Sequence, residues 1–226
     1  MLTGAGISAE SGIKTFRDAD GLWEEYNVMD VATPEAWQRD SGFVQDFYNK
    51  RRKQLLTVKP NPGHLALAQA QEFLDVQIIT QNIDNLHEAA GSHNVLHLHG
   101  ELLKARSSVD PSLIYDIDGW EIPMGKKCEK GSQLRPHVVW FGEPVPAIPI
   151  AADIVASADL LAIVGTSLNV YPAASLIDYA PSGIPIYLID PKDVMVAARP
   201  NLTFIQAPAS TGVPKMIEMI KDAGVM

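Results

Sequence analysis

The sequence predicts an α/β fold, a mostly parallel sheet flanked by helices, with a small second lobe made of two insertions. Apolar runs bounded by turn residues alternate with helical patterns, which is typical of βαβ units. Two stretches, 23–57 and 104–136, break this alternation and are the expected insertions. We therefore expect a single domain over 1–226 whose sheet part comprises 1–22, 58–103 and 137–226. The strand runs are Val76–Ile79, Val95–Leu98, Val138–Phe141, Leu160–Val164, Ile186–Ile189 and a weaker Leu202–Ile205.

Helix signals lie between these runs. Apolar residues recur at helical spacing in Pro62–Leu74 and Val213–Ile220. A helix over Pro172–Tyr179 would open on proline, which loses no hydrogen bond at that position. In the first insertion Ser41 is expected to cap a helix that runs to Leu55.

Composition narrows the class of protein. At 226 residues, 46% hydrophobic and 20% charged, the chain reads as soluble and globular. No apolar run approaches the ~18 residues that suggest a membrane span, and no signal peptide is evident. A net charge of −9 argues against nucleic acid, whose phosphates need a basic surface. The lone cysteine, Cys128, excludes an internal disulfide, and we expect a cytoplasmic protein.

The chain opens on a glycine turn, Gly4-Ala5-Gly6, after almost no first strand. Such a turn lets the backbone approach a pyrophosphate at a helix N-terminus, although its spacing is not G-x-G-x-x-G. A tight turn without a ligand is an equal alternative. Further on, Arg17 suits a phosphate and Phe16 could cover a ribose.

Polar groups follow three of the predicted strands, at the edge where an open α/β sheet binds ligands. In Gln81-Asn82-Ile83-Asp84 the amides and the carboxylate could hold a carboxamide and sugar hydroxyls, or merely cap a helix. Gly165-Thr166-Ser167 could face a phosphate. Asp190-Pro191-Lys192 could bind ribose hydroxyls or cap a turn.

His99 is the candidate general base. It is expected to share one strand with His97, followed by Gly100. A lone strand histidine is more often a structural group, but Asn82 and Asp84 nearby favour catalysis.

These motifs, in order along nearly the whole chain, resemble the sirtuins, a family of NAD-dependent protein-lysine deacylases. The resemblance implies a Rossmann-type sheet, NAD as co-substrate, and acyl-lysine proteins or peptides as substrates. It also implies nicotinamide, O-acyl-ADP-ribose and free lysine as products. The matching motifs are Gly4–Ser8, Gly12–Arg17, Gln81–Asp84, His99-Gly100, Phe141–Glu143 and Gly165–Ser167.

The resemblance also implies roles. His99 would be the base, Gln81 and Asn82 would bind the nicotinamide ribose, and Asp84 the carboxamide. The residues near the pyrophosphate and in the cofactor loop would be Gly4, Ala5, Gly6, Phe16 and Arg17, and Ile83 would lie in the nicotinamide-binding loop. Those near the adenosine would be Gly165, Thr166, Ser167, Asp190, Pro191, Lys192 and Ala209. Peptide would pair as an added strand with Val138–Glu143, which holds Val139, Phe141, Gly142 and Glu143, and with Leu168–Val170.

A narrower resemblance concerns the acyl group. Ala32, Tyr48 and Arg51 look like the class III branch, which removes acidic acyl groups such as succinyl. Tyr48 and Arg51 are three residues apart on a predicted helix and so share a face. An arginine fork and a hydroxyl suit a carboxylate, and alanine leaves room. Alternatively, Arg51 belongs to a basic helix surface, Lys50–Lys53.

Metal is the main departure. Sirtuins usually hold a structural zinc with four cysteines, and one thiol cannot close that site, so we predict no zinc. The second insertion, 104–136, is a small module that we expect to be packed by apolar residues instead of a metal: Ile114, Ile117, Trp120 and Ile122.

Other functions stay open: a non-catalytic NAD or ADP-ribose-binding protein, or a deacylase restricted to another acyl group. A dehydrogenase lacks support because neither G-x-G-x-x-G nor a Tyr–Lys pair is found.

Overall fold

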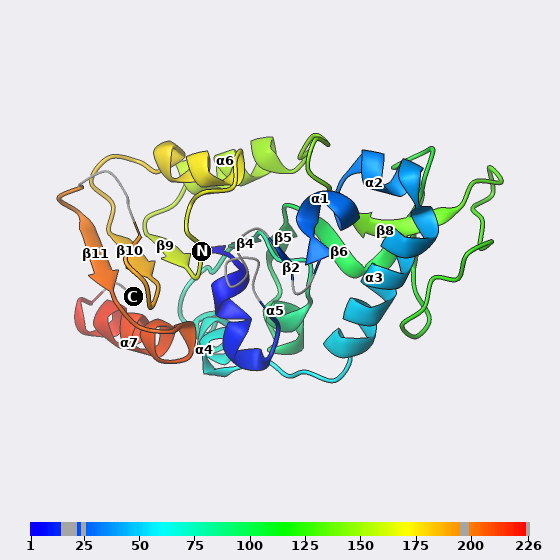
Figure 1. Cartoon of the computed structure of the whole chain (residues 1–226). Coiled ribbons are helices and arrows are strands. Elements are labelled where there is room, and N and C mark those ends of the chain that lie inside the picture. The colour runs from blue at the N-terminus through cyan, green and yellow to red at the C-terminus, as the bar shows by residue number, and fades with distance from the viewer. Residues whose placement is uncertain (15–21, 24–25, 195–198, 225–226) are drawn as a thin grey trace.

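The computed structural model describes residues 1–14, 22–23, 26–194 and 199–224. Within them, six parallel strands form the central sheet in the order β11-β10-β9-β1-β4-β5 (Figure 1). This confirms the predicted mostly parallel sheet. The strands are β1 (Leu2–Thr3), β4 (Ile78–Thr80), β5 (Val95–His97), β9 (Leu161–Val164), β10 (Ile186–Ile189) and β11 (Leu202–Ile205).

Helices cover both faces of this sheet (Figure 1). Successive strand residues enter opposite cores: Ile78 packs with α4 and α7, and Ile79 packs with α6 and η4. Burial on both faces explains why such strands are short continuous apolar runs. The covering elements are α4 (Pro62–Ala70), α5 (Leu86–Ala89), α6 (Ile148–Ala156), the 3₁₀ helix η4 (Ala173–Tyr179) and α7 (Ala209–Asp222).

A small antiparallel sheet, β7-β6-β8, lies at the other end of the molecule beside three helices (Figure 1). Phe47 and Tyr48 of the longest of these helices share a core with Leu102, Val138 and Trp140. The elements here are α1 (Val28–Val31), α2 (Pro34–Arg39), α3 (Ser41–Leu55), β6 (Gly100–Ser107), β7 (Ile114–Asp116) and β8 (Leu134–Val138). The remaining short elements are η1 (Ala5–Ile7), η2 (Ala9–Ser11) and the pair β2 (Leu22–Trp23) and β3 (Tyr26–Asn27).

Two local predictions of strands were wrong. The run Val138–Phe141 is not a parallel strand, because Val138 ends β8, which pairs antiparallel with β6. His99 is not in a strand, since β5 ends at His97 and a turn at Leu98-His99 leads into β6. That turn needs Gly100, which has φ +79° and whose Cβ would collide with the His137 carbonyl oxygen.

Two further details of the small lobe also differ. Asp40, not Ser41, caps α3, because its Oδ1 accepts a hydrogen bond from the Phe43 N–H at 2.9 Å. Ile114 and Trp120 do not pack the small module as expected, since they are 46% and 36% exposed. Ile122 does pack there as expected, in a core with Ala105, Cys128 and Leu134, and Ile117 packs against that core with Leu113 and Tyr115.

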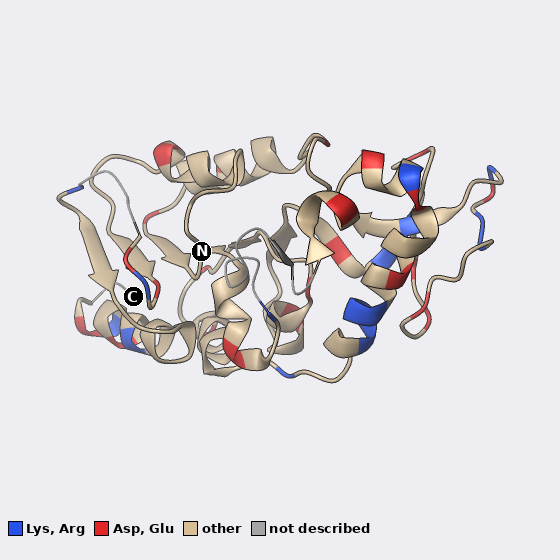
Figure 2. Ribbon diagram, in the orientation of Figure 1, with Lys and Arg blue, Asp and Glu red and all other residues tan. Residues whose placement is uncertain are grey.

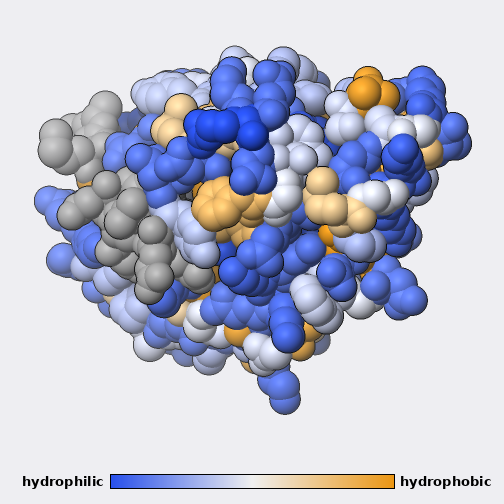
Figure 3. Space-filling model, turned by 45° about the vertical axis from the view of Figure 1, so that its right-hand side comes forward, coloured by the Kyte–Doolittle hydropathy of each residue, from blue (hydrophilic) through white to orange (hydrophobic). Residues whose placement is uncertain are grey.

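The face shown in Figure 3 is mostly hydrophilic, with a small apolar area near its centre. Among the described residues, no helix combines the length and apolar character that a membrane crossing requires.

Candidate active site

The site begins where the strand order reverses. β1 lies between β4 and β9, so the loops after these three strands meet at one edge, where open α/β sheets bind ligands. They open onto a cleft of about 450 Å³. The Gly6 N–H donates to the Gly165 carbonyl at 2.8 Å. A Cβ on Gly6 would lie 2.6 Å from Gly165 Cα, so this contact requires glycine.

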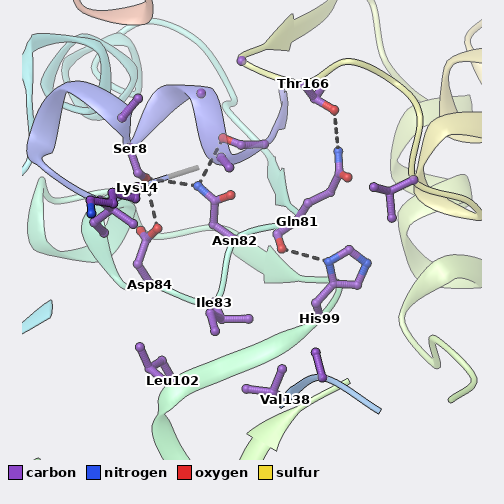
Figure 4. A pocket seen from close by; sticks show the side chains of 18 of the residues that line it. Ser8, Lys14, Gln81, Asn82, Ile83, Asp84, His99, Leu102, Val138 and Thr166 are labelled. Atoms are coloured by element: carbon purple, nitrogen blue, oxygen red, sulfur yellow. Dashed lines mark hydrogen bonds between the residues drawn. The ribbon is translucent and has the colours of Figure 1, made fainter. Parts of the chain in front are cut away.

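The loop after β4 holds its polar side chains in place (Figure 4). Gln81 Nε2 donates to Thr166 Oγ1 at 3.0 Å, which joins this loop to the one after β9. Asn82 Nδ2 donates to the Gly4 carbonyl at 3.2 Å and to Ser8 Oγ at 3.1 Å. The cluster predicted from sequence is thus brought together, with most of its hydrogen bonds already formed.

Asp84 is buried at the end of that loop. Its Oδ2 accepts from the Ser8 hydroxyl at 3.0 Å, and its Oδ1 accepts from the Leu86 N–H at 3.1 Å. Burial raises the pKa of Asp84 above its usual value, although these two hydrogen bonds oppose the shift. Ser8 was not predicted as a site residue, yet it contacts both Asn82 and Asp84.

His99 lines the same cleft, and one of its ring nitrogens is hydrogen-bonded to the protein backbone. Nδ1 lies 2.9 Å from the Gln81 carbonyl oxygen, which can only accept, so Nδ1 carries the proton (Figure 4). Burial lowers the pKa of His99, partly offset by this hydrogen bond. Nε2 is therefore the unprotonated, basic nitrogen at neutral pH. These are the properties of a general base.

The residues expected at the acyl group line the other part of the cleft. Tyr48 is fully buried, and its Oη accepts from Trp140 Nε1 at 2.9 Å. The Arg51 guanidinium carbon lies 3.4 Å from the centre of the Phe47 ring. Ala32 is also buried, and its carbonyl accepts from the Phe141 N–H at 3.0 Å.

Arg51 does not belong to a solvated basic surface. Lysine and arginine gather on α3 (Figure 2), but Arg51 is 6% exposed and Arg52 is fully buried. The Lys50 side chain, by contrast, is 59% exposed and pairs with Asp46. The structure thus separates Arg51, which lines the cleft, from its exposed neighbour.

A charged cluster supports the segment expected to bind peptide. Glu143 accepts from Arg106 at 2.8 Å, from Arg135 at 2.8 and 3.1 Å, and from the Trp140 N–H at 2.8 Å. Burial by itself raises the pKa of Glu143, but these partners outweigh it and the pKa lies below its usual value. Arg135 also stacks on the Trp140 ring at 3.3 Å. Sequence reasoning missed Trp140, Arg135 and Arg106.

The other predicted residues are placed as follows. Ala209 is 3% exposed within the sheet core, and its neighbour Pro208 lines the cleft instead. Phe16 and Arg17 lie outside the described residues. Those that line the cleft are Gly4, Ala5, Gly6, Ala32, Tyr48, Arg51, Gln81, Asn82, Ile83, Asp84, His99, Val139, Phe141, Gly142, Glu143, Gly165, Thr166, Ser167, Asp190, Pro191 and Lys192.

Comparison with known proteins decides the family. The sequence model of the Sir2 family matches residues 4–172, more than half of the chain. The protein belongs to the Sir2 family. A relative from Bacteroides thetaiotaomicron, named NAD-dependent protein deacylase, is 53% identical over 228 residues, covering 99% of this chain and 97% of its own. One of the same name from Helicobacter pylori is 52% identical over 225 residues, covering 97% of each.

Solved Sir2 structures share the fold. A mutant Sir2 homologue in complex with ADP-ribose has a TM-score of 0.89 and 37% identity, covering 100% of this chain and 92% of its own. A Sir2 homologue–NAD complex has a TM-score of 0.86 and 37% identity, covering 98% and 88%. The sirtuin resemblance drawn from the motifs is therefore confirmed.

The zinc site expected of many sirtuins does not fit these residues. Cys128 is the chain's one cysteine, and its sulfur lies 3.4 Å from Ser107 Oγ and 3.1 Å from Ser132 Oγ. These hydrogen bonds lower the pKa of Cys128 to about 7. Among the residues that the structure describes, no three His, Cys, Asp or Glu side chains converge as a metal site. Neutral hydroxyls are not the ligands of a structural zinc.

Proposed function

We propose that this Sir2-family protein is an NAD-dependent protein-lysine deacylase with His99 as its base and a preference for acidic acyl groups such as succinyl. The observation that carries the proposal is one cleft. It brings the basic Nε2 of His99, the Gln81–Asp84 loop, and the Tyr48–Arg51 pair together. The names of the relatives support the NAD-dependent reaction.

The residues fit NAD, because the cleft combines glycines, whose backbone a pyrophosphate can approach closely, with side-chain amide donors. When bound, NAD would supply an electrophilic ribose carbon and nicotinamide as the leaving group. Asn82 and Gln81 would hold sugar hydroxyls, and Asp84 would hold the carboxamide. His99 Nε2 would take the proton from a ribose hydroxyl, so that this oxygen can attack the acyl carbon. General bases typically contribute 10²- to 10⁴-fold to such steps.

The acyl end would recognise charge. Arginine presents a fork of N–H donors that matches a carboxylate. The Tyr48 hydroxyl accepts from Trp140 Nε1, and a hydroxyl is a donor as well as an acceptor. Burial also raises the pKa of Tyr48, so it stays a donor. A succinyl carboxylate between Arg51 and Tyr48 would accept hydrogen bonds from both side chains.

The acylated peptide would lie between two segments of the cleft rim. Phe141 is 43% exposed, and Gly142 has φ +87°, next to the charged cluster at Glu143. Leu168–Val170 would form the facing segment. An extended peptide could add to them as a strand, with backbone hydrogen bonds for affinity.

A peptide panel tests the proposal. Acetyl, succinyl, malonyl and lipoyl lysine peptides are incubated with NAD and assayed by mass spectrometry, with free nicotinamide measured separately. We expect nicotinamide release that depends on peptide, with succinyl or malonyl turned over fastest. NAD binding without turnover of any peptide would indicate a non-catalytic binding protein. Turnover limited to acetyl or lipoyl would overturn the acyl assignment alone.

A further inference from the structure

Two histidines hold adjacent carbonyls of the Gln81–Asp84 loop. His99 Nδ1 lies 2.9 Å from the Gln81 carbonyl oxygen, and His97 Nδ1 lies 2.9 Å from the Asn82 carbonyl oxygen. Both carbonyls can only accept, so both Nδ1 atoms carry protons. The two rings therefore support the same loop, and the difference between them lies in their second nitrogens.

His97 has an acceptor at its second nitrogen as well. Nε2 lies 2.7 Å from Glu88 Oε1 on α5, with the His97 side chain 8% exposed. Burial alone would raise the pKa of Glu88, but its contact with His97 lowers that pKa below the usual value, so Glu88 is ionised. A ring that donates to a carbonyl and to a carboxylate needs two N–H groups. This geometry fits a doubly protonated imidazolium at His97, whereas His99 needs a proton only on Nδ1 for its hydrogen bond to Gln81.

Other charged groups around His97 agree with that state. Glu101 on β6 favours the charged ring, and it pairs with Lys104 at 2.9 Å. Burial holds the pKa of His87 on α5 well below its usual value, so His87 adds no positive charge at neutral pH. For His97, burial lowers the pKa, but the hydrogen bonds to Glu88 and Asn82 and the Glu88 charge raise it overall.

His97 holds Asn82 through its backbone carbonyl. The Asn82 side chain donates to Gly4 and Ser8, and its N–H donates to Thr80 Oγ1 at 3.1 Å. Without the donor at the carbonyl, the peptide between Asn82 and Ile83 could rotate. That rotation would move Asp84 relative to Asn82.

We propose that His97 is a positioning residue whose protonated ring, paired with Glu88, fixes the nucleotide-binding loop and sets the alkaline limit of the enzyme. The kinetic part rests on the proposed function, while the protonation state does not. As pH rises and the ring loses one proton, it can no longer donate to both acceptors. The loop then loosens while the base, His99, stays in its active form.

The protonation state is tested first, without any substrate. Nitrogen-15 NMR of the histidine rings should show both His97 nitrogens protonated at pH 7, with His99 neutral and His93 as the exposed reference. Glu88→Gln should shift the His97 titration to lower pH. A neutral His97 at pH 7 in the unaltered protein would overturn the proposal, whatever the protein's activity.

Kinetics test the consequence. Glu88→Gln should move the alkaline limb of kcat/KM for NAD to lower pH and raise KM for NAD roughly tenfold at pH 8, as expected for a lost charge-assisted hydrogen bond. Its acid limb should not move. Glu101→Gln is the matched control, since it removes a nearby charge but no hydrogen bond to His97. Identical profiles for the two variants would refute the role of the Glu88 contact.

A conservative replacement separates position from charge. An asparagine side chain at position 97 can place its amide N–H where His97 Nδ1 lies, and that donor does not titrate. His97→Asn should therefore keep KM for NAD within a few fold of normal and lose the alkaline limb. His97→Leu, with no donor, should raise KM across the pH range. An unchanged alkaline limb in His97→Asn would assign that limb to another group. If no variant or parent protein turns over NAD, calorimetric NAD binding against pH replaces KM, and the same shifts are expected.

Discussion

Replacing Arg51 by methionine tests the acyl specificity most directly. Arg51 is 6% exposed, lies 3.4 Å from the Phe47 ring centre, and donates to the Phe47 carbonyl at 3.1 Å. Methionine keeps an unbranched side chain but removes the guanidinium, together with its contacts to the Phe47 ring and carbonyl. A hydrogen bond to a charged group is worth about 1.5–3 kcal/mol net. At about 1.4 kcal/mol per factor of ten, that predicts a loss of roughly 10- to 100-fold in kcat/KM for succinyl-lysine peptide.

The assay compares succinyl and acetyl peptides of the same sequence, with NAD saturating. Acetyl-lysine turnover should barely change, because acetyl carries no carboxylate for Arg51 to bind. Lys50→Met is the matched control, since Lys50 is the exposed cation one residue away, and it should change neither substrate. Equal losses on both peptides would mean that Arg51 acts through structure or NAD. No loss on either would remove it from the acyl site.

Four other outcomes are expected. His99→Ala should lower turnover by ~10²-fold or more while circular dichroism shows the fold intact, and near-normal turnover would refute His99 as the base. In the unaltered protein, the acid limb of the kcat/KM pH profile should lie below the usual histidine pKa of 6.5, because burial lowers the pKa of His99. Asp84→Ala should raise KM for NAD and weaken nicotinamide inhibition together, and wild-type values for both would refute the carboxamide role. Elemental analysis should find no stoichiometric zinc, and a chelator should leave the melting temperature unchanged; one zinc per chain would contradict the prediction.

The parts of the fold predicted from sequence are those whose burial shows in the local pattern. β10 and β11 were predicted with their observed bounds, Ile186–Ile189 and Leu202–Ile205. β10 reads as a short apolar run between Pro185 and Asp190. β8 was misplaced because its residues, Leu134–Val138, include arginine, proline and histidine. Arg135 is buried there with Glu143 as its ion-pair partner, and no local pattern reveals such a partner.

The site divides in the same way. Gln81, Asn82 and Asp84 follow a predicted strand, so topology alone placed them near the glycine turn. The Trp140–Tyr48 hydrogen bond joins residues 92 positions apart, from the small sheet's edge to α3. Sequence spacing carries no information about that contact. The environment of Arg51 was likewise ambiguous, because it is one of four consecutive basic residues on a helix. Tertiary packing, which the sequence does not show, buries Arg51 and leaves Lys50 exposed.

Each half of the cleft has its own set of supporting contacts, which explains why acyl preference and NAD chemistry should separate by mutation. In the nucleotide half, hydrogen bonds between Gly6 and Gly165, Gln81 and Thr166, and Asn82 and Gly4 tie three strand-end loops into one closed set. In the acyl half, Tyr48 is held by Trp140, and Trp140 is held by Glu143 and Arg135. Backbone hydrogen bonds link the halves, from the Val139 N–H to His99 and from the Leu102 N–H to Ile83. A side-chain change at Arg51 leaves those backbone links intact, so its effect should stay with the acyl group.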